Sequence, residues 1–507
     1  MRSVSHFFKN LQEKIMRKII DMQMKIGETA IANIKFDLRS RDEIPKLLIG
    51  LQAIHGNPEV RNQVFEVLTE LIPSHVDPKN GRKGMDLWTI FVLGTLRLNC
   101  NWNYDKLQEI ANNHNKLRQM LGHGIMEADY QYGLQTLKDN ISLFTPEILD
   151  KINRIVIKFG HQIAGKKKDE KLTGSCDSFV VETNVEFPTD INLLFTAIRK
   201  MISLVMIVCG FINLSEWRQG SHHIRKIKRL LRSAQLLRKA ALKDPDKKAE
   251  RERLVISAHQ ELIDQAQYYV DKVKETLIGI QPINIKLHSR MMEIQGYIHH
   301  AERQIDQIRR RVIVGESIPH AEKVFSLFEP HTEWISKGKA GVPVELGLRV
   351  CIVKDQFQFI LHHRVMQNET DDQIAVSIIE EVLSRFPDFS ACSFDKGFHS
   401  PYNQAKLSEI LEKVYLPRKG KLSAINKEIE NSEEFKAARR KHSAVESSIN
   451  ALENHGLDRC PDHGIDSFKR YAAMSVVARN IQIIGHMLQQ KELKRLHRQE
   501  KRTRLAA

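Results

Sequence analysis

The fold is decided by the segment VELGLRVCIVKDQFQFILHHRV, residues 344–365. Apolar side chains alternate along its first half, at Val344, Leu346, Leu348, Val350 and Ile352. After a polar triplet at 354–356 the alternation resumes, at Phe357, Phe359, Leu361, His363 and Val365. A period of two is typical of strands with one buried face, and the polar triplet supplies a turn. The segment therefore predicts a β-hairpin.

Strands and helices alternate on both sides of this hairpin. Residues 174–183 upstream have the composition of a strand, and Thr370 with Gln373 downstream forms a capping box that begins a helix. Further on, we expect strands at 391–394 and 413–416 and helices at 402–411, 435–454 and 466–488. The order strand, hairpin, helix, strand, helix, strand, helix predicts a ribonuclease-H-like α/β core with a mixed five-stranded sheet.

A long helical segment separates the first strand from the hairpin. It opens near Pro188 and extends to about residue 328. Apolar residues recur in it with heptad spacing, at Leu287, Met291, Ile294, Ile298, Ala301, Ile305, Ile308 and Val312, and more weakly at Val255, Leu262, Tyr269 and Val273. Heptads predict a coiled-coil-like helical hairpin, with pairing between two chains as the alternative.

Basic residues crowd residues 225–243 within this insertion, at Lys226, Lys228, Arg229, Arg232, Arg238 and Lys239. They could line a path for DNA, and the alternative is the solvated face of an amphipathic helix.

Residues 1–165 are predicted to be helical. Asp86 can cap a helix that starts at Leu87, and polar breaks at 99–103 and 112–115 separate it from two further helical runs. Short helices with tight turns, and with Lys106, Lys116 and Arg118 exposed, would suit a helix-turn-helix DNA reader. A small helical bundle with a solvated face is the equal alternative.

The composition favours a chain with a real core and a polyanionic partner. The 507 residues include 42% hydrophobic residues, and Lys plus Arg exceed Asp plus Glu by 78 to 62, giving a net charge of +16. The most apolar stretch, 201–214, is too short to span a membrane, and there is no signal-peptide pattern. Six scattered cysteines indicate reduced thiols in a cytosol, and His455, Cys460 and His463 lack the fourth ligand of a structural zinc site.

Three carboxylates fall at places where such a core does chemistry. Asp177 lies on the first strand, Asp395 ends the fourth strand, and Glu446 lies on a later helix beside a packing stripe. In-line cleavage of a phosphodiester uses two Mg²⁺ ions, which stabilise the attacking and leaving oxygens and prefer carboxylate ligands. From spacing alone, three ordinary acids remain the alternative.

The segments CDSFVVETNVEFPTD (176–190), FDKGFHSP (394–401) and HSAVESSINALENHGLDRC (442–460) resemble the three signature blocks of DDE transposases, most closely bacterial insertion-sequence enzymes of the ISNCY group. Blocks at 36–46, 83–90 and 330–341 are also similar, so the resemblance covers residues 16–488. It implies that Asp177, Asp395 and Glu446 are the catalytic and metal-binding acids. It also implies a recombinase that uses two Mg²⁺ ions, or Mn²⁺ in their place, on the inverted repeats of its own element.

The chain departs from the family at two kinds of place. Phe179 and Glu186 stand where a small polar residue and a histidine are expected, although neither belongs to the acid trio. Residues 1–15 lie outside the resemblance, and Met16 looks like the usual start, so we predict that 1–15 are a non-native or dispensable extension.

Other polar residues are candidates for contact with DNA. They are Lys337, Lys339, His399, Arg418, Lys419, Lys421 and His442. Lys and Arg supply the sequence-independent part of DNA affinity, while each of them is as often a solvated charge. Trp334 could stack on a flipped base, with a core or rim position as the alternative, and Glu182 is excluded because it lies on the opposite strand face from Asp177.

The sequence thus predicts a helical DNA-binding region at 16–165, a catalytic core at 166–190 plus 331–488, a helical insertion at 191–330 and a basic tail at 489–507. The expected function is a transposase that binds terminal inverted repeats and target DNA as a homodimer or larger synaptic complex, in the bacterial cytoplasm at the nucleoid. The alternatives are a structure-selective nuclease without strand transfer, an inactive DNA-binding descendant, and a coiled-coil scaffold.

Overall fold

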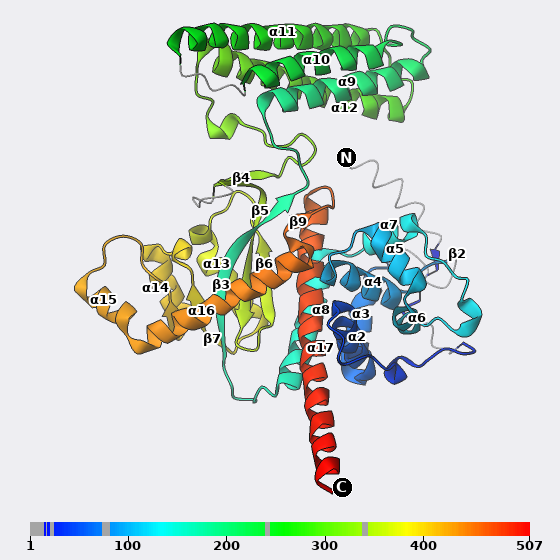
Figure 1. The fold of residues 1–507 in the computed structure, drawn as a ribbon, viewed down its shortest axis with the longest axis vertical. Coiled ribbons are helices and arrows are strands. Elements are labelled where there is room, and N and C mark those ends of the chain that lie inside the picture. The colour runs from blue at the N-terminus through cyan, green and yellow to red at the C-terminus, as the bar shows by residue number, and fades with distance from the viewer. Residues whose placement is uncertain are drawn as a thin grey trace. The chain divides into compact units, whose positions relative to one another are not determined.

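The chain forms two compact units in the computed structural model, which describes residues 15–16, 18–20, 25–72, 82–238, 244–336 and 343–506. One unit comprises residues 1–184 together with 335–507, and the other comprises 185–334. The second unit is therefore inserted into the first (Figure 1). The expected extension at 1–15 lies outside the described residues except for Ile15.

A mixed seven-stranded sheet organises the first unit. Its strands are β3 (Leu172–Thr183), β4 (Glu333–Ser336), β5 (Val344–Asp355), β6 (Ile360–Val365), β7 (Phe389–Phe394), β8 (Lys413–Tyr415) and β9 (Arg459–Cys460). The order is β4-β5-β3-β7-β8, with β6 beside β5 and β9 beside β3. β5 runs antiparallel to β3 and β6, whereas β7 is parallel to β3 and β8. The chain is thus a mixed α/β protein, as the sequence predicts, and β4 and β9 are short additions to the five expected strands.

The expected hairpin forms, but its turn lies a few residues later than predicted. β5 continues through Lys354 and Asp355, and Gln358 adopts a left-handed backbone with φ 78°. The Asp355 carboxylate accepts hydrogen bonds from the backbone N–H groups of Phe357 and Phe359, both at 2.9 Å. Asp355 therefore closes the turn from the end of the strand.

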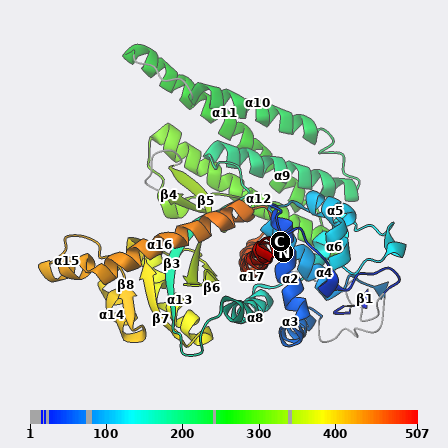
Figure 2. The same cartoon turned by 60° about the horizontal axis from the view of Figure 1, so that its bottom comes forward.

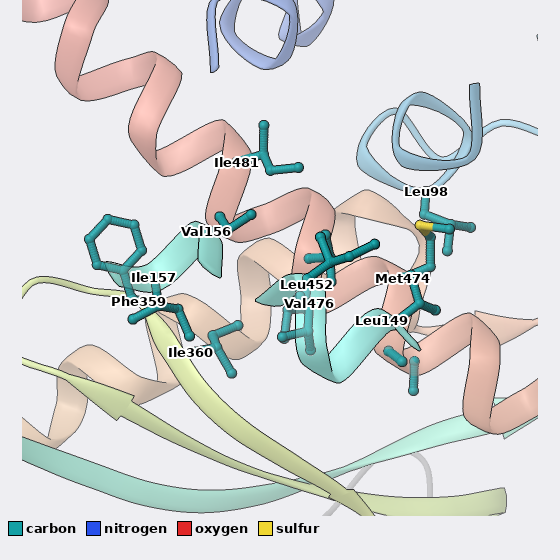
Figure 3. Close-up of a cluster of buried hydrophobic side chains, with 14 of the residues drawn as sticks. Leu98, Leu149, Val156, Ile157, Phe359, Ile360, Leu452, Met474, Val476 and Ile481 are labelled. Atoms are coloured by element: carbon teal, nitrogen blue, oxygen red, sulfur yellow. The ribbon is translucent and has the colours of Figure 1, made fainter. Parts of the chain in front are cut away.

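Helices cover the sheet and join it to the N-terminal segment. They are α8 (Pro146–Ala164), α13 (Asp371–Arg385), α14 (Pro401–Ile410), α15 (Ala424–Asn431), α16 (Glu433–Leu452) and α17 (Ile465–Ala506). The capping box at Thr370 and Gln373 is present, and α16 crosses the sheet (Figures 1 and 2). Figure 3 shows the core where α8 and α17 meet Ile360, the first residue of β6, and Phe359, which precedes it.

α17 is much longer than expected. It has 42 residues, so the segment predicted as a basic tail from residue 489 continues the helix through Ala506. The helix crosses α2 (Glu43–Gly56) at two glycines. A Cβ on Gly50 would lie 2.2 Å from the carbonyl oxygen of Ile481, and one on Gly485 would lie 1.8 Å from that of Lys46. Only glycine allows the two backbones to approach this closely.

Where it is described, the N-terminal segment of this unit is mainly helical and contains one parallel pair of two-residue strands, β1 (Ile15–Met16) and β2 (Arg82–Lys83). Besides α2 and α8 it contains α3 (Pro58–Thr69), α4 (Leu87–Asn99), α5 (Tyr104–Asn113), α6 (Asn115–Met120) and α7 (Leu134–Ile141). Asp86 caps α4 as predicted, accepting from the N–H of Thr89 at 2.8 Å.

Lys106 is exposed as predicted, but the same prediction is wrong for Lys116, which is half-buried. It is also wrong for Arg118, which is half-buried and held within the unit. Its guanidinium donates to the carbonyl oxygens of Asn112, Glu127 and Tyr130 at 3.2, 2.5 and 3.1 Å. These bonds tie α6 to the following loop. α6 is also only six residues long, with Leu117 and Met120 buried, which favours the small-bundle alternative for this region.

The second unit is a bundle of four helices: α9 (Asp190–Phe211), α10 (Gly220–Arg238), α11 (Pro245–Ile278) and α12 (Ile285–Ile308). The α12 heptad residues Leu287, Ile294, Ile298, Ala301, Ile305 and Ile308 are buried, as expected. They pack mainly along α9 and less along α11. The heptad residues therefore pack in the core of the bundle, and α11 and α12 do not form the simple two-helix hairpin that the heptads predict.

α9 is longer than the apolar stretch suggested. Among the described residues it alone is long and apolar enough to cross a membrane, with 22 residues and a mean hydropathy of 1.9 in its most apolar window. That window is 56% buried inside the unit, as in the core helix of a bundle.

Candidate active site

The central parallel strands bring Asp177 and Asp395 together. Cys176 on β3 is the register partner of Phe394 on β7, so the two aspartates follow at neighbouring positions. Asp395 keeps an extended backbone, with φ −74° and ψ 160°, and begins the 3-10 turn Lys396–Phe398. Side chains alternate along a strand, so Asp177 shares a face with Ser175 and Asp395 with Ser393.

α16 lies over this face. Ser393 Oγ is 2.9 Å from Ser175 Oγ and 3.0 Å from Nδ1 of His442 on α16. The Lys354 ammonium, buried on β5, donates to the carbonyl oxygen of Ala444 at 2.6 Å and to Ser448 Oγ at 3.3 Å. Glu446 follows His442 by one helical turn and is exposed. The three sequence-predicted acids therefore border the same face of the sheet.

Burial and neighbouring acids both act on the Asp177 carboxyl. The pKa of Asp177 is raised from 3.8 to about 7, mainly by burial and in smaller part by the negative charges of Asp395, Asp371 and Glu446, against a hydrogen bond from the Ser178 N–H. Burial lowers the pKa of His442, while Asp395 and Glu446 oppose that shift. Asp177 and His442 thus both lie within the field of the other acids.

Asp371 is a fourth acid that the sequence reasoning missed. It is the first residue of α13, and its carboxylate accepts a hydrogen bond from Ser178 Oγ at 2.6 Å. A Cβ on Gly397 would lie 3.0 Å from Asp371 Oδ2, so this carboxylate also lies against the turn that follows Asp395. An acid in the first turn of a helix is common for dipole reasons alone, so the sequence held no distinguishing signal.

The carboxylate oxygens at this site are ligands of the type that hard divalent cations prefer. The charges of Asp395, Asp371 and Glu446 all act on Asp177, and Mg²⁺ and Mn²⁺ prefer oxygen ligands of this kind. A bound cation would favour the charged form of Asp177, against both the burial and the repulsion that raise its pKa. In the parts of the chain that the structure describes, no three His, Cys, Asp or Glu side chains are gathered tightly enough to chelate an ion as they stand.

Basic residues gather beside Asp395. Lys419 donates its backbone N–H to Nδ1 of His399 at 3.3 Å and its ammonium to the carbonyl oxygen of Gly397 at 2.8 Å. Burial lowers the pKa of His399, and Arg418 and Lys419 lower it further. The His399 Nε2 is buried and has no hydrogen-bond partner among the described residues.

No contact among the described residues connects the other predicted DNA-binding residues to the acid site. Lys421 is exposed, and Lys337 and Lys339 lie outside the described residues. Trp334 packs against Phe325 and Phe187 in the second unit, with ring centroids 5.7 and 5.6 Å apart. That environment favours the rim or core alternative for this tryptophan.

Comparison with family models, with curated proteins and with solved structures finds no match to the chain. The functional assignment therefore depends on the geometry of these side chains and on the signature blocks of the sequence.

Proposed function

We propose that the chain is a DDE-type DNA transposase that cuts and joins DNA with divalent metal ions held by Asp177, Asp395 and Glu446. The observation that carries the proposal is the register of β3 and β7. It aligns two acids that are 218 residues apart in the sequence, under the helix that carries the third.

The sheet order supports a ribonuclease-H-like core. Three antiparallel strands, β6, β5 and β3, continue into the parallel strands β7 and β8, which is the arrangement expected of that fold. Ligand sites in such layered α/β sheets lie at the carboxyl ends of parallel strands, and Asp395 stands at that end of β7.

Each group has a separate chemical role in this proposal. The metal ions, when bound, activate water or a DNA 3′-hydroxyl and stabilise the leaving oxygen. Asp177 and Asp395 would hold the ions from the sheet, and Glu446 would hold them from α16. His442 holds α16 to β7 through Ser393. Arg418 and Lys419 attract the phosphate backbone to the strand end.

The test is incubation of the full chain with Mg²⁺ and a duplex that carries the DNA flanking its own gene. The account predicts metal-dependent cuts at inverted repeats and products joined to a target duplex. Both should be lost in Asp395→Asn and kept in Glu380→Gln, which removes an exposed acid of α13. Cuts without joined products would favour a structure-selective nuclease, and binding without cuts would favour an inactive DNA-binding protein.

A further inference from the structure

α10 of the bundle has a strongly basic outer face. Its 19 residues include no acid, and Arg225, Lys226, Lys228, Arg229 and Arg232 are all exposed. The opposite side of the helix is apolar and buried in the core of the unit, through Ile227, Leu230, Leu231 and Ala234. Packing of the apolar side therefore fixes the five cations on the outside.

The charge on this face is not compensated locally. None of the five cations forms an ion pair within the described residues, whereas other cations of the same unit do. Lys274 pairs with Glu302 at 2.5 Å, and Arg290 pairs with Glu293 at 2.8 Å.

The positive charges around α10 also act on the pKa of a neighbouring histidine. The pKa of His223 on α10 is lowered, first by burial and then by the cations Lys272 and Lys226 and by His222. An uncompensated cluster of this kind attracts a polyanion.

We propose that this face of α10 binds the phosphate backbone of duplex DNA, as a sequence-independent contact outside the acid site. Arg225, Arg229 and Arg232 have the i, i+4, i+7 spacing of one helix stripe and span about 10 Å along the axis. The phosphates of one DNA strand advance about 3.4 Å along the duplex per nucleotide, so the stripe matches roughly three of them. The identity of the polyanion as DNA rests on the proposed function.

An anionic membrane is a poorer partner for the same face. Surface-binding helices insert an apolar side into the lipid, and the apolar side of α10 is already buried in the bundle. What remains exposed is mainly charge, which suits a phosphate backbone.

The experiment measures DNA binding by the full chain in EDTA, so that no cutting is needed. Fluorescence anisotropy with a short duplex of arbitrary sequence gives the slope of log K against log salt. The triple variant Arg225→Gln/Arg229→Gln/Arg232→Gln is compared with Lys247→Gln/Lys274→Gln/Arg290→Gln. The control removes the same charge from cations of the same unit that already pair with acids.

The expected result is a salt slope smaller by about 2 to 3 in the α10 triple, because each lost phosphate contact removes about 0.9. The control should keep the slope of the unmodified chain. Equal slopes in all three proteins, or equal losses in both triples, would overturn the inference. So would binding of the unmodified chain to phosphatidylserine vesicles but not to DNA.

The outcomes separate this inference from the proposed function. If the α10 triple variant has a smaller salt slope but the unmodified chain never cuts DNA, the inference is supported and the transposase chemistry is refuted. A chain that cuts its own ends while the slope stays unchanged would refute the inference alone.

Discussion

Replacing Asp177 by Asn should stabilise the fold at neutral and alkaline pH in the absence of metal. The Asp177 carboxyl is half-buried among three other acids, and its pKa is raised from 3.8 to about 7. Asn keeps the shape of the side chain and can still accept the hydrogen bond from the Ser178 N–H, which is 2.8 Å in the native chain. It carries no charge, so both the cost of burying a carboxylate and the repulsion by the other acids disappear.

The sign and size of the effect follow from proton linkage. Below the unfolded-state pKa of 3.8 both states hold the proton, and between 3.8 and about 7 only the folded state keeps it. The free energy of unfolding therefore falls as the pH rises through this window, and the loss is complete above about 7. A shift of about 3 units corresponds to at most about 4 kcal/mol, since one unit is about 1.4 kcal/mol.

Urea denaturation in EDTA tests the prediction. Asp177→Asn should gain up to about 4 kcal/mol over the native chain at about pH 8 and almost nothing at about pH 4. The exposed-acid control Glu380→Gln should stay within about 0.5 kcal/mol at both values. At the higher pH, Mg²⁺ should reduce the difference in unfolding free energy between Asp177→Asn and the unmodified chain, because it should stabilise only the unmodified chain. A gain that is independent of pH, or a loss of stability at about pH 8, would refute the reasoning.

Three further predictions concern other contacts. Asp371→Asn should raise the Mg²⁺ concentration needed for DNA cleavage by about 10-fold or more, because this carboxylate supports the acid site; an unchanged Mg²⁺ dependence would contradict that role. Arg97→Gln should lower the free energy of unfolding by about 3 kcal/mol, measured in urea, since it removes the closer of the two arginines that pair with the mostly buried carboxylate of Asp462, at 2.8 Å, and leaves only Arg470 at 3.6 Å. Gly50→Ala should cost about 1–3 kcal/mol by forcing α2 away from α17, whereas Gly210→Ala, with open space around its Cβ, should be neutral or stabilising by calorimetry.

The strands and the positions of Asp177 and Asp395 could be predicted because local patterns encode them. Alternation identifies the hairpin, and a strand that stops at a polar residue puts that residue at a sheet end. The position of Asp371 was not predictable, because its role depends on Ser178 and Gly397, which contact it only in the folded chain.

The packing partners of the helices also could not be predicted from the sequence. The heptad seam of α12 shows that one side is buried, but its spacing carries no information that α9 is the main partner. Arg118 looks like any exposed cation in sequence, and only the fold brings four carbonyl oxygens to its guanidinium. Non-local contacts of this kind decide whether a charged residue is structural or free to bind a ligand.

The most direct test of the central claim is an anomalous difference map from crystals of the full chain grown with Mn²⁺ and a DNA end. The account predicts a peak within about 2–2.5 Å of carboxylate oxygens of both Asp177 and Asp395, with Glu446 nearby. No peak between the two aspartates, or a peak held only by other residues, would contradict it.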